Sequence, residues 1–378
     1  MKKVVSGVIG LLLFLISMLM LAYNIKQVKA EWTGTVYIRA NGSIDPPDAP
    51  ITSIDNVTYY VTDNIVVSYL GGIIVEKRNT VVDGQGFRIR GNSYYGISVT
   101  AINVTIKNFE IIGGGINVEG DNCVISHNNI SQCFIGIHLK SFNNLICYNN
   151  LSTNSYGIYI LSGFGNRIYH NNFVDNANHA LTGSGNYWDN GYPSGGNYWS
   201  DYRGADEKSG VGQNQIGSDG IGDTAYFIED NYKDNYPLMA PLFAFNAGSW
   251  GGISANVYVA SNSTVLNFQI NTPERVISFN VTGMQNTVGF CRITVPNILV
   301  QDMWQGNFTI LFDSEPWPFR NWTDSTNTYI YITYNHSEHE IVIIPEFPLT
   351  MILLLFMLTT LITTVLLMKK RKIERKLS

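Results

Sequence analysis

The 378-residue chain has little charge, because Asp, Glu, Lys and Arg make up only 14% of it, against about 25% in an average protein. Between its two ends it also lacks any helical periodicity long enough to matter, which argues against a helical fold. Asn, Gly, Ser, Thr and Tyr take the place of charged residues. This composition predicts an all-β protein with many turns.

The charge that is present is one-sided. Residues 31–348 hold 14 Lys and Arg against 28 Asp and Glu, a net charge of −14, whereas the whole chain carries −5. An acidic surface repels nucleic acid and anionic lipid, so neither is an expected ligand of this portion.

Sulfur-containing residues are few as well, with four Cys and nine Met in the chain. Three of the cysteines lie in the repeats described below but share no repeat position, so no disulfide is predicted. The alternating pattern around Cys291 predicts a buried free thiol. Soft ligands for copper are therefore scarce.

Long apolar runs occur only at the two ends. Residues 1–30 begin with two lysines, continue with the uncharged run Val4–Tyr23 and end at Ala30, which predicts a cleaved signal peptide, with an uncleaved anchor as the alternative. The run Leu349–Met368 has no charge and is long enough to cross a bilayer at ~1.5 Å per residue. The basic residues 369–378 predict a cytoplasmic tail. We expect a single-pass protein of the cell membrane with most of the chain extracellular.

Glycosylation signals support an extracellular location. The pattern Asn-x-Ser/Thr occurs ten times, always between the two apolar runs. Asn129 and Asn150 are expected to face outward from the repeats, and Asn280 and Asn307 from later strands. The ten acceptor positions are Asn41, Asn56, Asn103, Asn129, Asn150, Asn262, Asn280, Asn307, Asn321 and Asn335.

An Asn-Asn pair returns every 21 or 22 residues, at 128–129, 149–150 and 171–172. A fixed period near 20 residues is typical of stacked structural units. Each unit has two short alternating apolar runs separated by Gly and Asn, too short for the strands of a sandwich. They favour one coil of a parallel β-helix, stacked ~4.8 Å from the next.

The Asn pairs have a structural explanation in such a coil. One Asn of each pair is expected at a turn, in the left-handed conformation, with its amide pointing inward. Stacked amides hydrogen-bond to each other as a ladder, which we predict for Asn128, Asn149 and Asn171. Their neighbours then face outward.

The repeat Asn-x-Ile-x-x-Asn-x-Ile followed by Gly-Ile-x-Leu resembles the right-handed parallel β-helix proteins of the NosD-like group, especially archaeal surface members. The resemblance extends over residues 34–242 and includes Gly72–Gly91, Asn197–Tyr202 and Tyr236–Pro241. It implies the fold but not the function, because this fold includes pectin lyases, glycosidases, copper-maturation factors and adhesins. Residues 345–348, Pro-Glu-Phe-Pro, resemble an archaeal sorting signal.

The predicted organisation is a β-helix over residues 31–200, a cap over 201–242 and a second unit over 243–345. The second unit contains strand-like runs about 12 to 20 residues apart, which predicts an immunoglobulin-like β-sandwich acting as a stalk. The runs are Thr264–Ile270, Val276–Val281, Gly289–Val295, Asn307–Phe312, Thr328–Tyr334 and Glu340–Ile344.

Catalysis and copper binding are two alternatives that the repeat does not favour. Glycosidases need two nearby carboxylates, yet no two acids stand one coil apart, and Glu119 instead has Lys140 at that offset, as a cross-coil ion pair. His127 and His170 share a repeat position but lie two coils apart with Tyr148 between them, too far to bind one metal ion. No catalytic residue is predicted.

Calcium and carbohydrate are the ligands suggested by single motifs. Ser218 to Asp223 resembles half of a calcium loop, in which Asp219 and Asp223 supply carboxylates and Ile221 a carbonyl, although Asp or Asn is missing from the two preceding ligand positions.

An aromatic segment follows the last repeat and includes Tyr187, Trp188, Tyr198 and Trp199. Its residues are either a lid on the apolar core or a platform for sugars. We therefore expect a membrane-anchored binding or structural module, with a surface glycan as the most plausible ligand. A polysaccharide lyase or hydrolase and a copper-handling protein are the alternatives.

Overall fold

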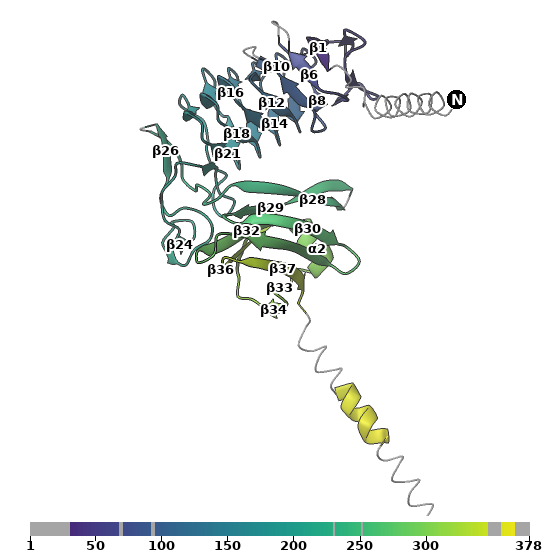
Figure 1. Cartoon of the computed structure of the whole chain (residues 1–378), viewed down its shortest axis with the longest axis vertical. Coiled ribbons are helices and arrows are strands. Elements are labelled where there is room, and N and C mark those ends of the chain that lie inside the picture. Colours follow the sequence, from purple (N-terminus) through teal and green to yellow (C-terminus); the bar gives the residue numbers. More distant parts are fainter. Residues whose placement is uncertain are drawn as a thin grey trace, which may run out of the picture.

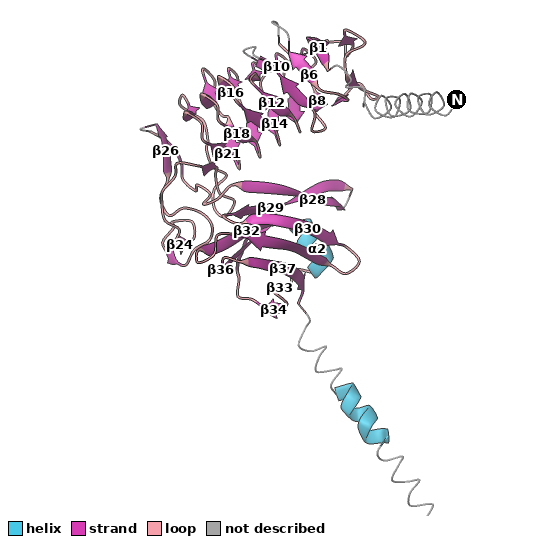
Figure 2. Cartoon of the chain, in the orientation of Figure 1, coloured by secondary structure: helices cyan, strands magenta, loops and turns pink. Residues whose placement is uncertain are grey.

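The computed structural model describes residues 31–67, 71–91, 95–229, 231–250, 252–346 and 357–366 of the chain. The signal peptide predicted over 1–30 and about half of the span predicted over 349–368 lie outside these residues. Within them the protein is almost entirely β-structure (Figures 1 and 2).

Three long sheets, which we call A, B and C, form the faces of a β-helix (Figure 1). Their strands run parallel, except at one end of sheets B and C, where Ile44–Asp45 and Ile51–Thr52 pair antiparallel with their neighbours. Each coil contributes one short strand to each sheet. Sheet A contains β1 (Trp32–Gly34), β6 (Ile65–Val67), β9 (Arg88–Arg90), β12 (Glu110–Ile112), β15 (Asn129–Ser131), β18 (Asn150–Ser152), β21 (Asn172–Val174) and β23 (Tyr198–Trp199). Sheet B contains β3 (Ile44–Asp45), β2 (Val36–Ile38), β7 (Ile73–Val75), β10 (Tyr95–Val99), β13 (Gly115–Val118), β16 (Ile135–Leu139), β19 (Tyr156–Ile160) and β22 (Asn178–Leu181). Sheet C contains β4 (Ile51–Thr52), β5 (Thr58–Val61), β8 (Thr80–Asp83), β11 (Val104–Lys107), β14 (Val124–Ser126), β17 (Leu145–Cys147) and β20 (Arg167–Tyr169).

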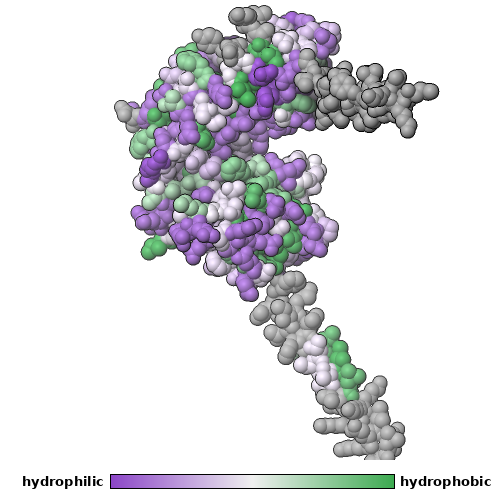
Figure 3. All heavy atoms as spheres, in the orientation of Figure 1, coloured by the Kyte–Doolittle hydropathy of each residue, from purple (hydrophilic) through white to green (hydrophobic). Residues whose placement is uncertain are grey.

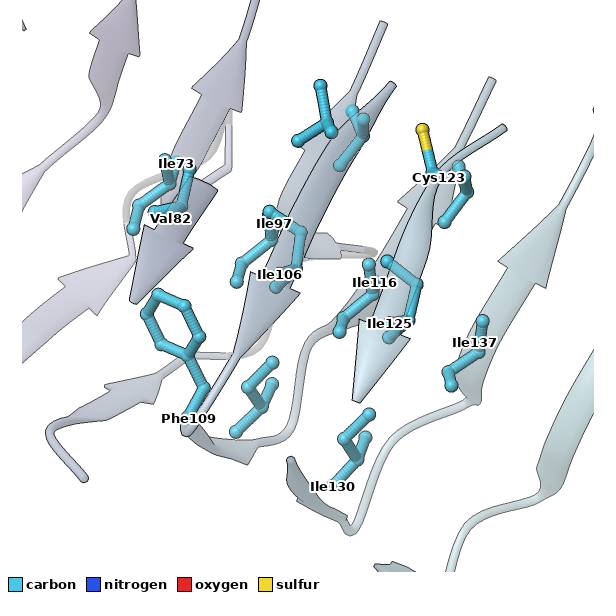
Figure 4. Close-up of a cluster of buried hydrophobic side chains, with 14 of the residues drawn as sticks. Ile73, Val82, Ile97, Ile106, Phe109, Ile116, Cys123, Ile125, Ile130 and Ile137 are labelled. Carbon is cyan, nitrogen blue, oxygen red and sulfur yellow. The ribbon is translucent and has the colours of Figure 1, made fainter. Parts of the chain in front are cut away.

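The parallel β-helix that the repeat predicts is therefore present. Equivalent residues of successive coils pair in register, as Ile130 does with Leu151 and Leu151 with Phe173. Their side chains stack in the interior, where Ile106, Ile125 and other aliphatic residues form a continuous buried core (Figure 4). Each interior coil packs its apolar side chains against the coils on both sides of it. This burial of apolar surface stabilises a solenoid.

Each coil has three strands, whereas the sequence suggested two alternating runs. The first run is divided by a corner at which one residue adopts positive φ, namely His127, Tyr148 or His170, with φ of 57°, 59° and 57°. The prediction that an Asn of each pair takes this conformation is wrong, because the residue just before the pair does so.

A cap of two small hairpins follows the last coil. It contains β24 (Lys208–Ser209) with β25 (Gln215–Ile216), and β26 (Tyr226–Glu229) with β27 (Tyr232–Asp234).

Two five-stranded antiparallel sheets then pack as a β-sandwich around a second core (Figure 2). Strand β31 alternates buried and partly exposed residues along its length, as its sequence predicts. The first sheet has the order β28 (Leu242–Trp250), β29 (Ile253–Ser261), β32 (Val288–Pro296), β36 (Asn327–Asn335) and β35 (Arg320–Thr323). The second has β30 (Thr264–Asn271), β31 (Val276–Thr282), β37 (Glu338–Pro345), β33 (Phe308–Phe312) and β34 (Glu315–Pro316), and helix α2 (Asn297–Trp304) packs beside the core.

The sandwich packs against the positive-φ corner of the β-helix. The rings of Tyr148 and Tyr258 stack 4.2 Å apart, and Asn172 exchanges two hydrogen bonds of 2.8 and 2.9 Å with the backbone of Leu242. Sheet B is therefore on a side of the β-helix that the sandwich does not cover.

Residues 357–366 form an exposed helix beyond the sandwich (Figure 1). None of the helices in the described ranges combines the length and the apolar character needed to cross a membrane. Elsewhere the visible surface is mostly hydrophilic, with scattered apolar patches (Figure 3).

Candidate functional site

The Asn residues predicted as a ladder lie in one buried column. The amide of Asn128 donates to the side-chain oxygen of Asn149, and that of Asn149 to Asn171, both at 3.0 Å. The column continues to Asn197, also at 3.0 Å. The side-chain oxygens of Asn149, Asn171 and Asn197 also accept the backbone N–H of the Asn one coil earlier, so the ladder satisfies backbone groups that the corner would otherwise leave unpaired. The ladder holds the corners and is not a ligand site.

Two further ladders support the other two corners. Asn144 donates to Asn166 at 2.8 Å and Asn166 to Asn186 at 3.0 Å, while Asn154 donates to Asn176 at 2.9 Å. Their spacings of 20 to 22 residues are close to the 21 or 22 of the Asn pairs, so the same signal could have revealed them in the sequence.

The predicted glycan acceptors are accessible to different degrees. Asn129 and Asn307 are exposed, whereas Asn150 and Asn280 are partly exposed. The amide nitrogen of Asn150 donates to the side-chain oxygen of Asn129 at 2.9 Å, so the two acceptors are neighbours on the outside of sheet A.

The aromatic segment divides into buried and exposed halves. Trp188 and Trp199 are only 2% and 1% exposed and belong to the core of the β-helix. The ring of Trp199 stacks on Phe173 of the last coil at 4.2 Å, and its indole N–H donates to Asp234 at 2.9 Å. Of the two alternatives for these two rings, the sugar platform is wrong, because the last coil and the cap cover them.

The two tyrosines of the same segment lie outside the core. Tyr187 is 62% exposed at the end of sheet C, while Tyr198 is partly exposed in β23. The structure therefore does not bring the four predicted aromatic residues together as one surface.

In the calcium-like loop, backbone N–H groups of the chain donate to the carboxylates of Asp219 and Asp223. The carboxylate of Asp219 accepts the N–H of Ile221 at 3.0 Å, and that of Asp223 accepts the N–H groups of Glu207 and Lys208, each at 3.1 Å. Burial is the main cause that raises the pKa of Asp219. Among the described residues, no three His, Cys, Asp or Glu side chains are placed to hold a metal ion, so this arrangement does not fit a bound calcium ion.

Two arginines of the sandwich supply positive charge to this loop. The guanidinium of Arg292 donates to the backbone oxygens of Asp219 and Pro193, and that of Arg320 donates to the backbone oxygen of Ser218 at 2.8 Å. Acidic and carbonyl groups that resemble half of a metal loop thus hold the cap against the sandwich.

A different set of side chains gathers on the outside of sheet B. Ser98, Asn117, His138 and Tyr159 pair in register from β10 to β19, one residue in each coil. Their neighbours on both sides along each strand are core aliphatic residues, so these four point away from the core. We call this row, together with Tyr156, the sheet B row.

The sheet B row presents planar polar groups. The rings of His138 and Tyr159 stack at 5.3 Å and 11°, and Tyr156 lies 5.9 Å from Tyr159. Within the described residues, the side-chain oxygen Oδ1 of Asn117 and the ring nitrogen Nε2 of His138 are buried without a hydrogen-bond partner. A buried polar atom without a partner is costly, so it needs an explanation, such as a bound ligand or water.

The charges beside the row are paired. Lys140 donates to Glu119 at 3.1 Å, which confirms the predicted cross-coil ion pair. Burial, followed by the nearby Lys140 ammonium, lowers the pKa of His138, which favours the neutral imidazole. The hydrogen bond from Asn117 is the main cause that lowers the pKa of Glu119. A carboxyl group with a lowered pKa stays ionised at neutral pH and is a poor general acid.

The histidines of the β-helix do not converge. Tyr148 lies between His127 and His170 with ring separations of 5.1 and 5.2 Å, as the repeat predicts. His138 is on sheet B, and His179 contacts Asp201 at 3.2 Å near the cap. Across the ranges that the structure describes, no three His, Cys, Asp or Glu side chains are arranged to hold a metal ion. All four cysteines are buried and free.

Comparison with known proteins identifies the β-helix. Residues 19–204 match the model of a family described as "Periplasmic copper-binding protein (NosD)". No curated protein and no solved structure matches the chain. The family description mentions copper, but the scattered histidines and buried thiols of the described residues do not fit a copper site.

Proposed function

Since the β-helix of this chain is NosD-like, we propose that the protein is an extracellular glycan-binding module held at the cell membrane. The observation that carries this proposal is the sheet B row, with its unpartnered Asn117 and His138 atoms among tyrosines.

The chemistry of the row suits a sugar. A sugar hydroxyl both donates and accepts, so one hydroxyl can donate to Oδ1 of Asn117 and accept from Nε2–H of His138. Both atoms are buried in the structure, so a ligand must displace a neighbouring side chain to reach them. The hydroxyls of Tyr156 and Tyr159, both partly exposed, have no partner within the described residues and supply further donors and acceptors.

Binding is favoured over cleavage by the state of the nearest acid. Glu119 is held by Lys140 and Asn117, and its pKa is lowered. Hydrolysis of a glycoside by a carboxyl pair needs one group with a raised pKa to protonate the leaving oxygen. We therefore propose a binding module rather than a lyase or hydrolase.

The proposed arrangement on the cell has three parts. A signal peptide directs residues 31–346 outside, the span Leu349–Met368 anchors them, and an immunoglobulin-like sandwich raises the β-helix above the membrane. This arrangement is supported by the amino-acid sequence at the two ends of the chain. Deleting residues 347–378 should release the protein from the membrane fraction into the medium, and retention of the deleted form with the membrane would contradict the anchor.

Binding should be tested with immobilised polysaccharides and the Tyr156→Ala/Tyr159→Ala variant. We expect the variant to lose retention while keeping its melting temperature. Tyr60→Ala removes a tyrosine that is 38% exposed on sheet C and is the matched control. Loss of binding in Tyr187→Ala, with the sheet B variant unaffected, would move the site to the aromatic segment.

A further inference from the structure

We propose that the ligand is an unbranched, uncharged polysaccharide that lies parallel to the β-helix axis, with about one sugar unit on each coil. This inference rests on the proposed function and specifies the ligand class and its direction on the sheet B row.

The direction follows from the register of the row. Ser98, Asn117, His138 and Tyr159 occupy equivalent positions in four consecutive coils. Neighbouring parallel strands are ~4.8 Å apart, a distance close to the advance of one sugar unit in an extended polysaccharide. A chain along the axis therefore meets a new polar side chain with each sugar, whereas a chain across the axis leaves the row after one unit.

The ends of the row limit the number of contacts. Beyond Tyr159 the same position is occupied by Leu181, and before Ser98 it is occupied by Ile74. Neither aliphatic side chain can hydrogen-bond to a hydroxyl. The polar part of the row thus corresponds to four sugar units, one for each of the strands β10, β13, β16 and β19.

The lack of charge in the ligand follows from the ion pairs along sheet B. Lys140 pairs with Glu119 at 3.1 Å, and Arg39 pairs with both Asp45 and Glu76. A uronate or sulfate needs a cation that is available to it. His138 does not supply one, because burial lowers its pKa. Acidic polysaccharides would instead meet a surface whose carboxylates outnumber its cations.

The experiment is a length series. Calorimetric titration of the full chain with neutral oligosaccharides from monosaccharide to octasaccharide, of the linkage found by screening neutral polysaccharides, should show the Kd falling several-fold with each added sugar. The gain should stop near the tetrasaccharide. The His138→Ala variant interrupts the row, so its gain should stop earlier, whereas Tyr60→Ala should follow the wild type.

The outcomes separate the two levels of the proposal. If no saccharide of any kind binds, the proposed function is wrong. If a monosaccharide binds as tightly as the octasaccharide, the module binds sugar but the lengthwise arrangement is wrong. If acidic polysaccharides bind and neutral ones do not, the inference of an uncharged ligand is wrong. An unchanged melting temperature for His138→Ala shows that the shortened series reflects lost contacts.

Discussion

The ladder of Asn149 gives the sharpest test of how the β-helix is held together. Asn149 is 1% exposed and donates to Asn171 at 3.0 Å and to the backbone oxygen of Ile125 at 2.8 Å. Its own oxygen accepts the backbone N–H and the amide of Asn128, both at 3.0 Å. Asn149→Ala removes all of these bonds and leaves the backbone N–H of Asn128 buried without this acceptor.

A buried group that loses its partner costs about 1 to 3 kcal/mol, and we expect a loss of unfolding free energy of that size for Asn149→Ala. Asn150→Ala is the matched control, since Asn150 is partly exposed and, within the described residues, its one side-chain hydrogen bond joins Asn129 on the surface. Surface changes of this kind usually stay within about 0.5 kcal/mol.

The measurement is urea denaturation of both variants and the wild type, produced without glycosylation and followed by tryptophan fluorescence. If the protein is then made in a glycosylating host, Asn150→Ala should also lose the mass of one glycan. Equal losses of stability in the two variants would refute the assignment of one Asn to the interior and the other to the surface.

Three further tests address the lid, the loop and a buried histidine. Trp188→Ala with Trp199→Ala should cause unfolding or aggregation from the last coil, because each ring buries roughly 150 to 250 Å², worth several kcal/mol; a folded variant that has lost only polysaccharide binding would contradict the lid. Calcium or a chelator should leave the melting temperature unchanged, because no three His, Cys, Asp or Glu side chains of the described residues are placed to hold a metal ion; a rise with calcium would establish the loop as a metal site. Burial lowers the pKa of His170 to about 4, so as the pH falls from about 6.5 to about 4 only the unfolded chain gains this proton, and stability should fall by up to about 3 kcal/mol. His170→Gln should show a smaller fall over the same range, and parallel pH profiles for the two proteins would argue against a buried neutral imidazole.

The sequence alone determined the features that follow from its repeat period and from the alternation of residues within a strand. The period of 21 or 22 residues predicts the stacked coils because each coil places the same residue type at the same point. The inward position of Asn149 and the pairing of Glu119 with Lys140 follow from that period without further information. The alternation in β31 likewise separates its buried and exposed residues.

Tertiary structure decided what the repeat could not specify. The residue just before each Asn pair, which is His127, Tyr148 or His170, adopts positive φ. The corner therefore starts one residue before the pair, and the inward Asn amide stabilises it. The burial of Trp199 depends on Asp234 and the cap, 35 residues away in sequence. The loop near Asp219 meets Arg292 only because the sandwich packs on the cap.

The candidate site shows the same division. One equivalent position in four repeats holds four different residue types, namely Ser98, Asn117, His138 and Tyr159. No single motif therefore marks this row in the sequence. The register between strands places the four residues in one row, and within the described part of the chain the packing around them leaves two polar atoms without partners. A repeat in sequence fixes which residues stack on one another. Whether a stacked row can bind a ligand depends on the groups that surround it, and these come from other parts of the chain.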